Sequence, residues 1–462
     1  MNYSIFRAYD IRGVYPGQIN EGVVYRIARN ANNVFKKGSC IIIGHDARSS
    51  SPVLYQVLAL GLRVAGMKVI RGGFMSTPML TFMVRTKKAG GGMMITASHN
   101  PPEYNGIKVV DKDGIAIGGD VILRRIGKRA LDVALDVGRM VSVKTPYSGA
   151  STDFLKDYGA FIARYVALKR PVRVVLDCSN GAVGPVWEAS LQFLSEDADI
   201  IAINNDPDGS FPAHGPNPLA PGALKQASLA VLEHNADMGV VFDGDGDRAI
   251  FLDEKGKQIR SEYIARLLWA HTKAHKCVYD EESLFLTARL AENMREKLTW
   301  PMKLYRSKVG HSFVAQAMKK YYSVVGFEFS GHYYFKEFWH ADSGIMASAL
   351  VMSAVSHLPY SLNTFVSLLP RTSRAREKNI VLKDQTMNRL ITAIRTHFKS
   401  RAKNISTYDG ISVYMDNAWC NVRASNTQPI VRINVEAETK EKESALSKEL
   451  EEVISKVIDD RR

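Results

Sequence analysis

A serine follows a short apolar run in the segment MMITASHNPP, residues 93–102. The pattern predicts a buried strand that delivers Ser98 onto an exposed loop, which the following Asn100 and Pro101 terminate. The prolines restrict this loop, so that little entropy is lost when it is held in one shape. A hydroxyl held in this way suits a nucleophile or a phosphoryl carrier, although an ordinary polar turn is the alternative for the motif taken alone.

Three aspartates alternate with glycines in the segment DGDGDR, where Asp243, Asp245 and Asp247 follow an apolar run. Carboxylates so close together repel one another unless a cation lies between them, and glycine lets the backbone fold tightly enough to point them inward. Hard oxygen ligands of this kind suit Mg²⁺. A calcium loop is excluded because its sixth position requires glycine and holds Arg248. An acidic hairpin turn is the remaining alternative, but such turns usually carry fewer acids.

Glu328, Ser330 and His332 alternate along the chain. On a strand-like loop these three side chains would face one side, where a carboxylate and a hydroxyl could bind neighbouring hydroxyls of a sugar. The alternative is a strand with a polar face.

Two further loops concentrate cationic and hydroxyl groups. The segment RASNTQP, which begins at Arg423, has the groups of a phosphate-binding nest. A second loop contains Arg306, Lys308 and His311, and Arg12 near the N-terminus could also face an anion. Taken singly, each of these residues is also consistent with a plain surface charge.

The helices and strands that position these loops are predicted to form α/β units. Residues 40–44 predict a buried strand, and Ser51 is expected to cap a helix that has Pro52 at its first position and ends near Gly66. A strand at 68–70 follows, and this order indicates a largely parallel sheet. Two further α/β units are predicted to begin in a similar way, with strands at 172–177 and at 283–287.

The last hundred residues change character. The segments 411–415, 419–422 and 430–436 read as strands, and the spacing of apolar residues predicts a terminal helix over 438–460. A small α+β domain fits this pattern.

Composition narrows the class of protein. The 462 residues are 46% hydrophobic and 23% charged, which is typical of a globular chain too long for one core. The formal charge of +14 is scattered, so we favour a small anionic substrate over nucleic acid. The four cysteines are far apart, without the spacing of a zinc site or a disulfide framework. With no signal peptide or membrane-spanning run apparent, the expected location is the cytoplasm.

The motifs occur in the order seen in the α-D-phosphohexomutases, which the chain resembles from Phe6 to Glu436. The resemblance rests on TASHNP (96–101), DGDGDR (243–248), EFSGH (328–332) and RASNT (423–427). Within that superfamily the chain is most similar to the bacterial-type phosphomannomutase/phosphoglucomutase. Phosphoglucosamine mutase is the alternative, but those enzymes usually differ where this chain has Gly246 and Phe329.

The resemblance implies an α/β fold with three mixed α/β domains of the phosphoglucomutase type and a C-terminal α+β lid domain around a central cleft. We expect a domain with the phosphoserine loop at 1–147, one with the metal-binding loop at 148–254, one with the sugar-binding loop at 255–367 and a phosphate-binding domain at 368–462. The implied reaction is reversible phosphoryl transfer between O1 and O6 of a mannose or glucose phosphate through a bound hexose 1,6-bisphosphate. The implied cofactors are Mg²⁺ and glucose 1,6-bisphosphate (or mannose 1,6-bisphosphate) as activator.

The resemblance also implies a role for each candidate residue. Ser98 would carry the phosphoryl group and bind Mg²⁺ together with Asp243, Asp245 and Asp247. Lys108 matches the candidate acid or base, and we expect nearby arginines to lower its pKa. The phosphoserine would be lined by Arg12, His99 and Arg248. The substrate would be bound by Lys308, His311, Glu328, Ser330, His332, Arg423, Ser425, Asn426 and Thr427.

The expected partner is a small phosphosugar, with no nucleic acid and no membrane, and the protein is expected to be a monomer. Two other functions compete. A metal phosphatase would use Ser98 and the same aspartates but release phosphate to water, and a nucleic-acid-binding protein would explain the charge. Phe327, His45 and Gln428 depart from the pattern of the family and leave the preferred sugar open.

Overall fold

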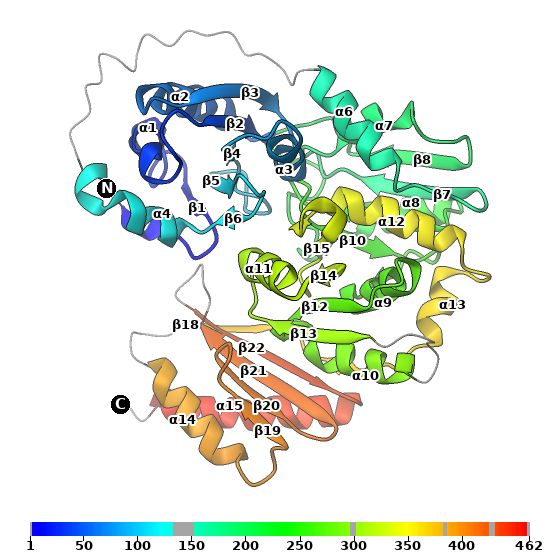
Figure 1. Cartoon of the computed structure of the whole chain (residues 1–462). Helices are drawn as coiled ribbons and strands as arrows, with labels where there is room; N and C mark the ends of the chain where they lie inside the picture. Colours follow the sequence, from blue (N-terminus) through cyan, green and yellow to red (C-terminus); the bar gives the residue numbers. More distant parts are fainter. Residues whose placement is uncertain (1, 133–151, 296–301, 382–385, 425–429, 460–462) are drawn as a thin grey trace. The chain divides into compact units, whose positions relative to one another are not determined.

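The computed structural model describes residues 2–132, 152–295, 302–381, 386–424 and 430–459 (Figure 1). The chain forms two compact units. The first comprises Met1–Val278 and His311–Ser367, and the second comprises Tyr279–Gly310 and Leu368–Arg462. In the part of the chain that the structure describes, none of the helices has the length and apolar character that a membrane crossing requires.

The first unit opens with a mixed sheet in the order β1-β5-β4-β2-β3, in which β6 pairs with β5. Strands β2, β3 and β4 run parallel, whereas β5 runs antiparallel to β1, β4 and β6, so the sheet is only partly parallel. Its elements are β1 (Ile11–Val14), α1 (Glu21–Arg29), β2 (Cys40–His45), α2 (Ser51–Val64), β3 (Lys68–Phe74), α3 (Thr77–Thr86), β4 (Gly91–Ile95), β5 (Tyr104–Asp111), β6 (Ala116–Ile117), α4 (Gly119–Ile126) and α5 (Lys128–Leu131).

The predicted strand, helix and strand at the start of this sheet are confirmed, but the predicted cap is wrong. The residue before α2 is Ser50, and it makes no capping hydrogen bond through its side chain. Ser51 is already helical, and its hydroxyl donates to Asp46 Oδ1 at 2.6 Å. A buried carboxylate next to the helix start therefore takes the hydroxyl that would otherwise have capped the backbone.

A second sheet in the same unit has the order β11-β10-β9-β7-β8. Strand β7 is parallel to β8 and β9, while β9 and β10 form an antiparallel hairpin. Its elements are α6 (Thr152–Ala163), β7 (Val172–Asp177), α7 (Gly184–Leu191), β8 (Ala198–Ile203), α8 (Lys225–Glu233), β9 (Met238–Phe242), β10 (Ala249–Leu252) and β11 (Gln258–Ile259).

The rest of the first unit packs around an apolar helix. Every residue of α12 (Gly344–Ser356) is buried, because the helix contacts α6 and α9 as well as strands of the second sheet. The other elements of this part of the unit are α9 (Ser261–His271), α11 (His311–Tyr321), α13 (Leu362–Ser367) and the antiparallel strands β14 (Val325–Phe327), β15 (Tyr333–Phe335) and β16 (Ala341–Asp342).

The second unit contains an antiparallel sheet in the order β17-β22-β21-β20-β19, in which β18 pairs with β22. Helices α14 and α15 lie against this sheet (Figure 1). Alternate strand residues form one apolar core with the two helices. The elements of this unit are α10 (Leu284–Arg295), β13 (Lys303–Ser307), β17 (Ser373–Arg374), β18 (Lys378–Val381), α14 (Thr386–Phe398), β19 (Asn404–Ser406), β20 (Ile411–Tyr414), β21 (Ala418–Ala424), β22 (Ile430–Ala437) and α15 (Lys440–Asp459). The predicted C-terminal strands and helix are confirmed, as is the α/β class with an α+β C-terminal domain.

The strand predicted over 283–287 is wrong, because these residues begin a helix. The strand is β12 (Lys276–Asp280), a few residues earlier, and it crosses the division between the two units along the chain. Asp280 accepts hydrogen bonds from the amide and the hydroxyl of Ser283, at 3.0 and 2.5 Å. This cap starts a helical turn directly after the strand, and α10 continues from it.

Replacing Leu450 by alanine tests the core of the second unit. Leu450 lies in α15 with no exposed surface, so Leu450→Ala should lower the free energy of unfolding by about 2–5 kcal/mol. The exposed Glu452 on the same helix supplies the control, and Glu452→Ala should change the value by about 0.5 kcal/mol or less. Denaturant unfolding followed by circular dichroism measures both, and equal effects of the two changes would contradict this packing.

Candidate functional site

Ser98 lies in the loop after β4, but it is buried and not exposed as predicted. The hairpin between β9 and β10 covers it so closely that a Cβ on Gly244 would come within 3.0 Å of Ser98 O. The hydroxyl of Ser98 donates to Asp243 Oδ2 at 2.8 Å and lies 3.2 Å from His99 Nδ1. Its φ of +51° is in the left-handed region, which few residues other than glycine adopt.

The three aspartates converge as predicted. They are buried in the hairpin turn, and one oxygen of each lies within 4.8 Å of the others. Gly246 has a φ of +79°, and this conformation folds the turn back toward Asp243. Asp243 Oδ1 accepts the backbone N–H groups of Gly246 and Arg248 at 3.0 and 3.1 Å.

Lys108 places its ammonium group against this cluster. Its Nζ donates to Asp245 Oδ2 at 2.7 Å and to Asp247 Oδ2. Burial alone would lower the pKa of Lys108, but the charges of Asp245 and Asp247 outweigh it and raise the pKa. The expectation that arginines lower this pKa is therefore wrong for the protein without a bound cation.

The carboxylates differ in how their charge is balanced. Burial, together with the charges of Asp247 and Asp245, raises the pKa of Asp243 well above its usual range. For Asp247, burial is outweighed by Lys108 and His332, which hold its pKa well below that range. The negative charge of Asp247 is therefore balanced by nearby cations, whereas that of Asp243 is not.

The cluster fits a hard divalent cation. Asp245 Oδ1 is buried without a hydrogen-bond partner. The carboxylates of the cluster would also offer a cation oxygen ligands only. Asp247 also forms a second group of possible ligands with His332 and Asp342.

Two arginines and a histidine adjoin the serine loop. Arg12 donates to the side chains of Asn100 and Asp10. Arg248 Nε lies 3.3 Å from His332 Nε2. Burial and the charges of Arg248 and Arg12 lower the pKa of His99 well below its usual value, so that this imidazole is neutral.

Glu328, Ser330 and His332 meet, although not on a strand-like loop as predicted. Strand β14 ends before Glu328, and the chain turns at Gly331, which has a φ of +88°. Within this turn His332 Nδ1 lies 2.8 Å from Ser330 Oγ and 3.3 Å from Glu328 Oε2. The side chains converge because the turn folds back.

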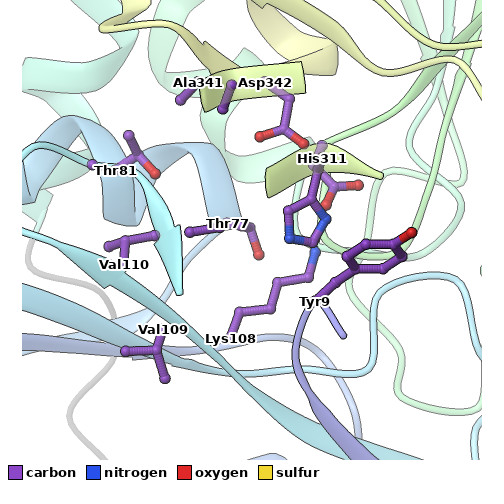
Figure 2. Close-up of a pocket in the computed structure, with 13 residues that line it drawn as sticks. Tyr9, Thr77, Thr81, Lys108, Val109, Val110, His311, Ala341 and Asp342 are labelled. Atoms are coloured by element: carbon purple, nitrogen blue, oxygen red, sulfur yellow. The ribbon is translucent and has the colours of Figure 1, made fainter. Parts of the chain in front are cut away.

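Lys108 and His311 face one pocket together with Tyr9 and Asp342, as Figure 2 shows. The rings of Tyr9 and His311 are 5.5 Å apart. Burial, with the charges of Lys108 and His332, lowers the pKa of His311 to about 4. His311 was predicted in a cationic loop, but at neutral pH it is an uncharged hydrogen-bonding group.

The remaining predicted residues belong to the second unit. Lys308 is exposed, and its Nζ lies 5.8 Å from the ring centroid of Tyr408. Arg423 is buried and donates to Glu282 Oε1 through Nε, at 3.0 Å, and through a terminal nitrogen. Ser425, Asn426 and Thr427, like Gln428, lie outside the described residues.

Three residues beside the serine loop were missed by the sequence analysis. Arg48, Asp46 and Thr96 are buried. Arg48 and Thr96 form hydrogen bonds with the backbone of Ser98, and Asp46 accepts one from Thr96. The available signal was an aspartate and an arginine, two residues apart, directly after the predicted strand at 40–44.

Comparisons with family models cover most of the chain. The four described domains of phosphoglucomutase/phosphomannomutase match in order: alpha/beta/alpha domain I at residues 3–132, domain II at 153–256, domain III at 287–372 and the C-terminal domain at 377–453.

Individual proteins agree with these matches. A phosphomannomutase of Salmonella montevideo is 35% identical over 452 residues, which cover 94% of this chain and 95% of that protein. Proteins of Xanthomonas campestris described as phosphohexose mutases are 32% identical over 441 residues, covering 94% of this chain and 95% of theirs. A crystal structure of a phosphoglucomutase/phosphomannomutase family protein from Burkholderia thailandensis has a TM-score of 0.82 and 27% identity, with 99% of this chain and 98% of that chain covered.

The depressed pKa of His311 predicts how stability depends on pH. The folded state binds this proton only near pH 4, whereas an unfolded histidine binds it near 6.5, so stability falls as pH drops below about 6.5. His311→Asn should therefore lose less stability than the unaltered protein between pH 7 and pH 5 in denaturant titrations. Parallel slopes for His311→Asn and the unaltered protein would rule out a neutral imidazole in the folded state.

Proposed function

The chain belongs to the phosphoglucomutase/phosphomannomutase family and is a phosphohexose mutase, an isomerase, and on that premise we propose that it moves a phosphoryl group reversibly between O1 and O6 of a hexose. The observation that carries the proposal is the Ser98 hydroxyl, 2.8 Å from Asp243 and buried beside two more carboxylates. A hydroxyl in such a place can carry a phosphoryl group whose charge a cation balances.

The proposed reaction has two transfers. In the first, the bond between phosphorus and Ser98 Oγ breaks as phosphorus bonds to the free O1 or O6 of a hexose monophosphate, which gives a bound 1,6-bisphosphate. The proton of the attacking sugar hydroxyl passes to a base, for which Lys108 is the candidate, and the departing Ser98 Oγ takes up a proton. The bound bisphosphate then reorients. Ser98 Oγ takes the other phosphoryl group, and the sugar oxygen from which this group departs regains a proton.

The chain's own groups would bind and orient the reactants. Arg12 and Arg248 supply positive charge to the phosphoserine, and the neutral His99 supplies a hydrogen bond. Glu328 and Ser330 are suited to O3 and O4, which glucose and mannose share. The non-reacting phosphate would be held by Lys308, His311, Arg423, Ser425, Asn426 and Thr427, with His332 beside the sugar.

Mg²⁺ fits the acidic cluster and would be held by Asp243, Asp245, Asp247 and an oxygen on Ser98. A bound divalent cation neutralises the charge of the transferring phosphoryl group. It would also reduce the field of Asp245 and Asp247 at Lys108, so that the amine could give up a proton more readily.

The proposed substrates are mannose and glucose phosphates. A relative at 35% identity is described as a phosphomannomutase and others as phosphohexose mutases, which supports these sugars over glucosamine phosphate. A hexose 1,6-bisphosphate would prime Ser98. We also propose that the protein is a monomer and acts in the cytoplasm on small phosphosugars.

A coupled assay tests this function. Purified protein receives Mg²⁺, a trace of glucose 1,6-bisphosphate and either glucose 1-phosphate or mannose 1-phosphate. We expect the 6-phosphate from both sugars, with kcat/KM values within about a hundredfold of each other, and no product from Ser98→Ala, because that variant cannot carry the phosphoryl group. A larger preference would refute dual use, product from glucosamine 6-phosphate alone would identify the alternative mutase, and steady release of phosphate would identify a phosphatase.

Arg423 allows a separate test of phosphate binding. Arg423→Ala should raise KM for glucose 1-phosphate about tenfold or more, since a charge-assisted contact is lost. Glu282→Gln is the matched control, because it removes the carboxylate that pairs with Arg423 but keeps the guanidinium. Equal rises in KM for both variants would point to an anchoring role for Arg423, and unchanged KM and kcat in Arg423→Ala would exclude it from the phosphate site.

A further inference from the structure

Arg48 is a fully buried arginine in the turn between β2 and α2, and none of the proposed catalytic steps uses it. Its Nε donates to Asp46 Oδ2 at 3.1 Å, and its backbone N–H donates to Asp46 Oδ1 at the same distance. The charge is thus paired within its own turn. The two terminal nitrogens of the guanidinium remain to bind other groups.

Those two nitrogens bind the backbone of the phosphoryl-carrier loop. One donates to Ser98 O at 2.7 Å and Asn100 O at 2.6 Å, and the other to Pro101 O at 2.6 Å and Tyr104 O at 3.0 Å. All four carbonyls belong to the seven-residue segment that begins at the carrier serine. Hydrogen bonds to a charged donor are stronger than neutral ones, so the loop is held at both ends.

Asp46 holds the other side of the same serine. Its Oδ2 accepts from Thr96 Oγ1 at 2.7 Å, and Thr96 Oγ1 in turn accepts from the backbone N–H of Ser98 at 2.9 Å. Asp46 and Arg48 therefore bind the two backbone groups of Ser98, the N–H through Thr96 and the carbonyl directly. This arrangement stabilises the left-handed φ of Ser98, from which its hydroxyl reaches Asp243.

The segment between β8 and α8 covers the guanidinium of Arg48. The ring centroid of Phe211 lies 5.2 Å from Arg48 Cζ. A Cβ on Gly209 would come within 2.5 Å of Ser49 N, so this segment lies directly against the Arg48 turn. Water is thereby kept from the hydrogen bonds between Arg48 and the carrier loop.

We propose that Arg48 is a positioning residue for phosphoryl transfer, which holds the carrier loop so that Ser98 Oγ lies in line with the phosphorus that it accepts or donates. The inference rests on the proposed function. The transfer itself is unchanged: the bond from phosphorus to the sugar oxygen breaks as the bond to Ser98 Oγ forms, and the serine proton passes to the departing oxygen. Lysine cannot replace arginine here, because a single ammonium group cannot span carbonyls as a planar guanidinium does.

The test compares Arg48→Lys with Arg63→Lys, the same change at an exposed position of α2. The first measurement is the single-turnover rate at which Ser98 takes the phosphoryl group from glucose 1,6-bisphosphate, followed by intact mass. The others are kcat and KM for glucose 1-phosphate and the midpoint of thermal unfolding.

For Arg48→Lys, the transfer rate and kcat should fall about 100-fold while KM changes by about twofold or less, since misplacement of reacting atoms affects the transition state more than binding. Arg63→Lys should match the unaltered protein. A merely structural role for Arg48 would lower the midpoint of unfolding but leave the transfer rate per folded molecule unchanged.

Phe211→Leu provides a second test if Arg48→Lys does not fold. This change removes the aromatic ring over the guanidinium but keeps an apolar side chain, and it should slow transfer several-fold with KM unchanged. Transfer at the unaltered rate in folded Arg48→Lys overturns the inference, and so does unaltered transfer in Phe211→Leu if the arginine variant cannot be folded. If the unaltered protein and Arg63→Lys also fail to take the phosphoryl group, the proposed function itself is wrong and the inference falls with it.

Discussion

Three carboxylates buried in one hairpin turn impose the constraint on which the rest of the first unit depends. Their repulsion is balanced by Lys108 from β5, by the Ser98 hydroxyl and by backbone N–H groups of the turn itself. The first two of these partners require close packing between segments far apart in the sequence. Helix α12 begins against the same turn, where a Cβ on Gly344 would come within 2.4 Å of Arg248 O. The first two sheets are therefore tied together at the point where the chemistry is proposed to occur.

The carrier loop illustrates how a fold supplies precision to a reaction that depends on positioning. Phosphoryl transfer leaves the protein little covalent chemistry beyond the carrier bond, so placement and charge neutralisation account for most of the catalysis. Ser98 adopts a backbone conformation unusual for serine, and it is held there by hydrogen bonds from the turn after β2 and from its own loop. A buried guanidinium that binds four carbonyls is a rigid support, because its planar geometry and its charge are both constant at any pH in ordinary use.

The second unit uses buried charge in a different way. Glu281 and Glu282 lie beneath the polar face of its sheet, where Ser412 and Tyr414 donate to Glu281 and Arg423 donates to Glu282. Burial would raise the pKa of Glu282, but Arg423 and other nearby arginines lower it, so that this carboxylate stays charged. Removing one partner of such a pair would leave an unpaired buried charge, which is strongly unfavourable. Glu281 and Glu282 are thus held by the C-terminal sheet of the second unit.

The sequence by itself determined the α/β class, the C-terminal α+β unit and the loops that bear Ser98, the three aspartates and Glu328, because hydrophobic periodicity and short polar motifs are local properties of the chain. It could not show that Ser98 is buried, that Ser51 binds Asp46 in place of capping its helix, or that His311 is uncharged. Those outcomes depend on desolvation and on charges contributed by distant segments, which only tertiary packing brings together. Arg48 shows the difference most clearly, since its side chain is ordinary in sequence and its role arises from four carbonyls about fifty residues away.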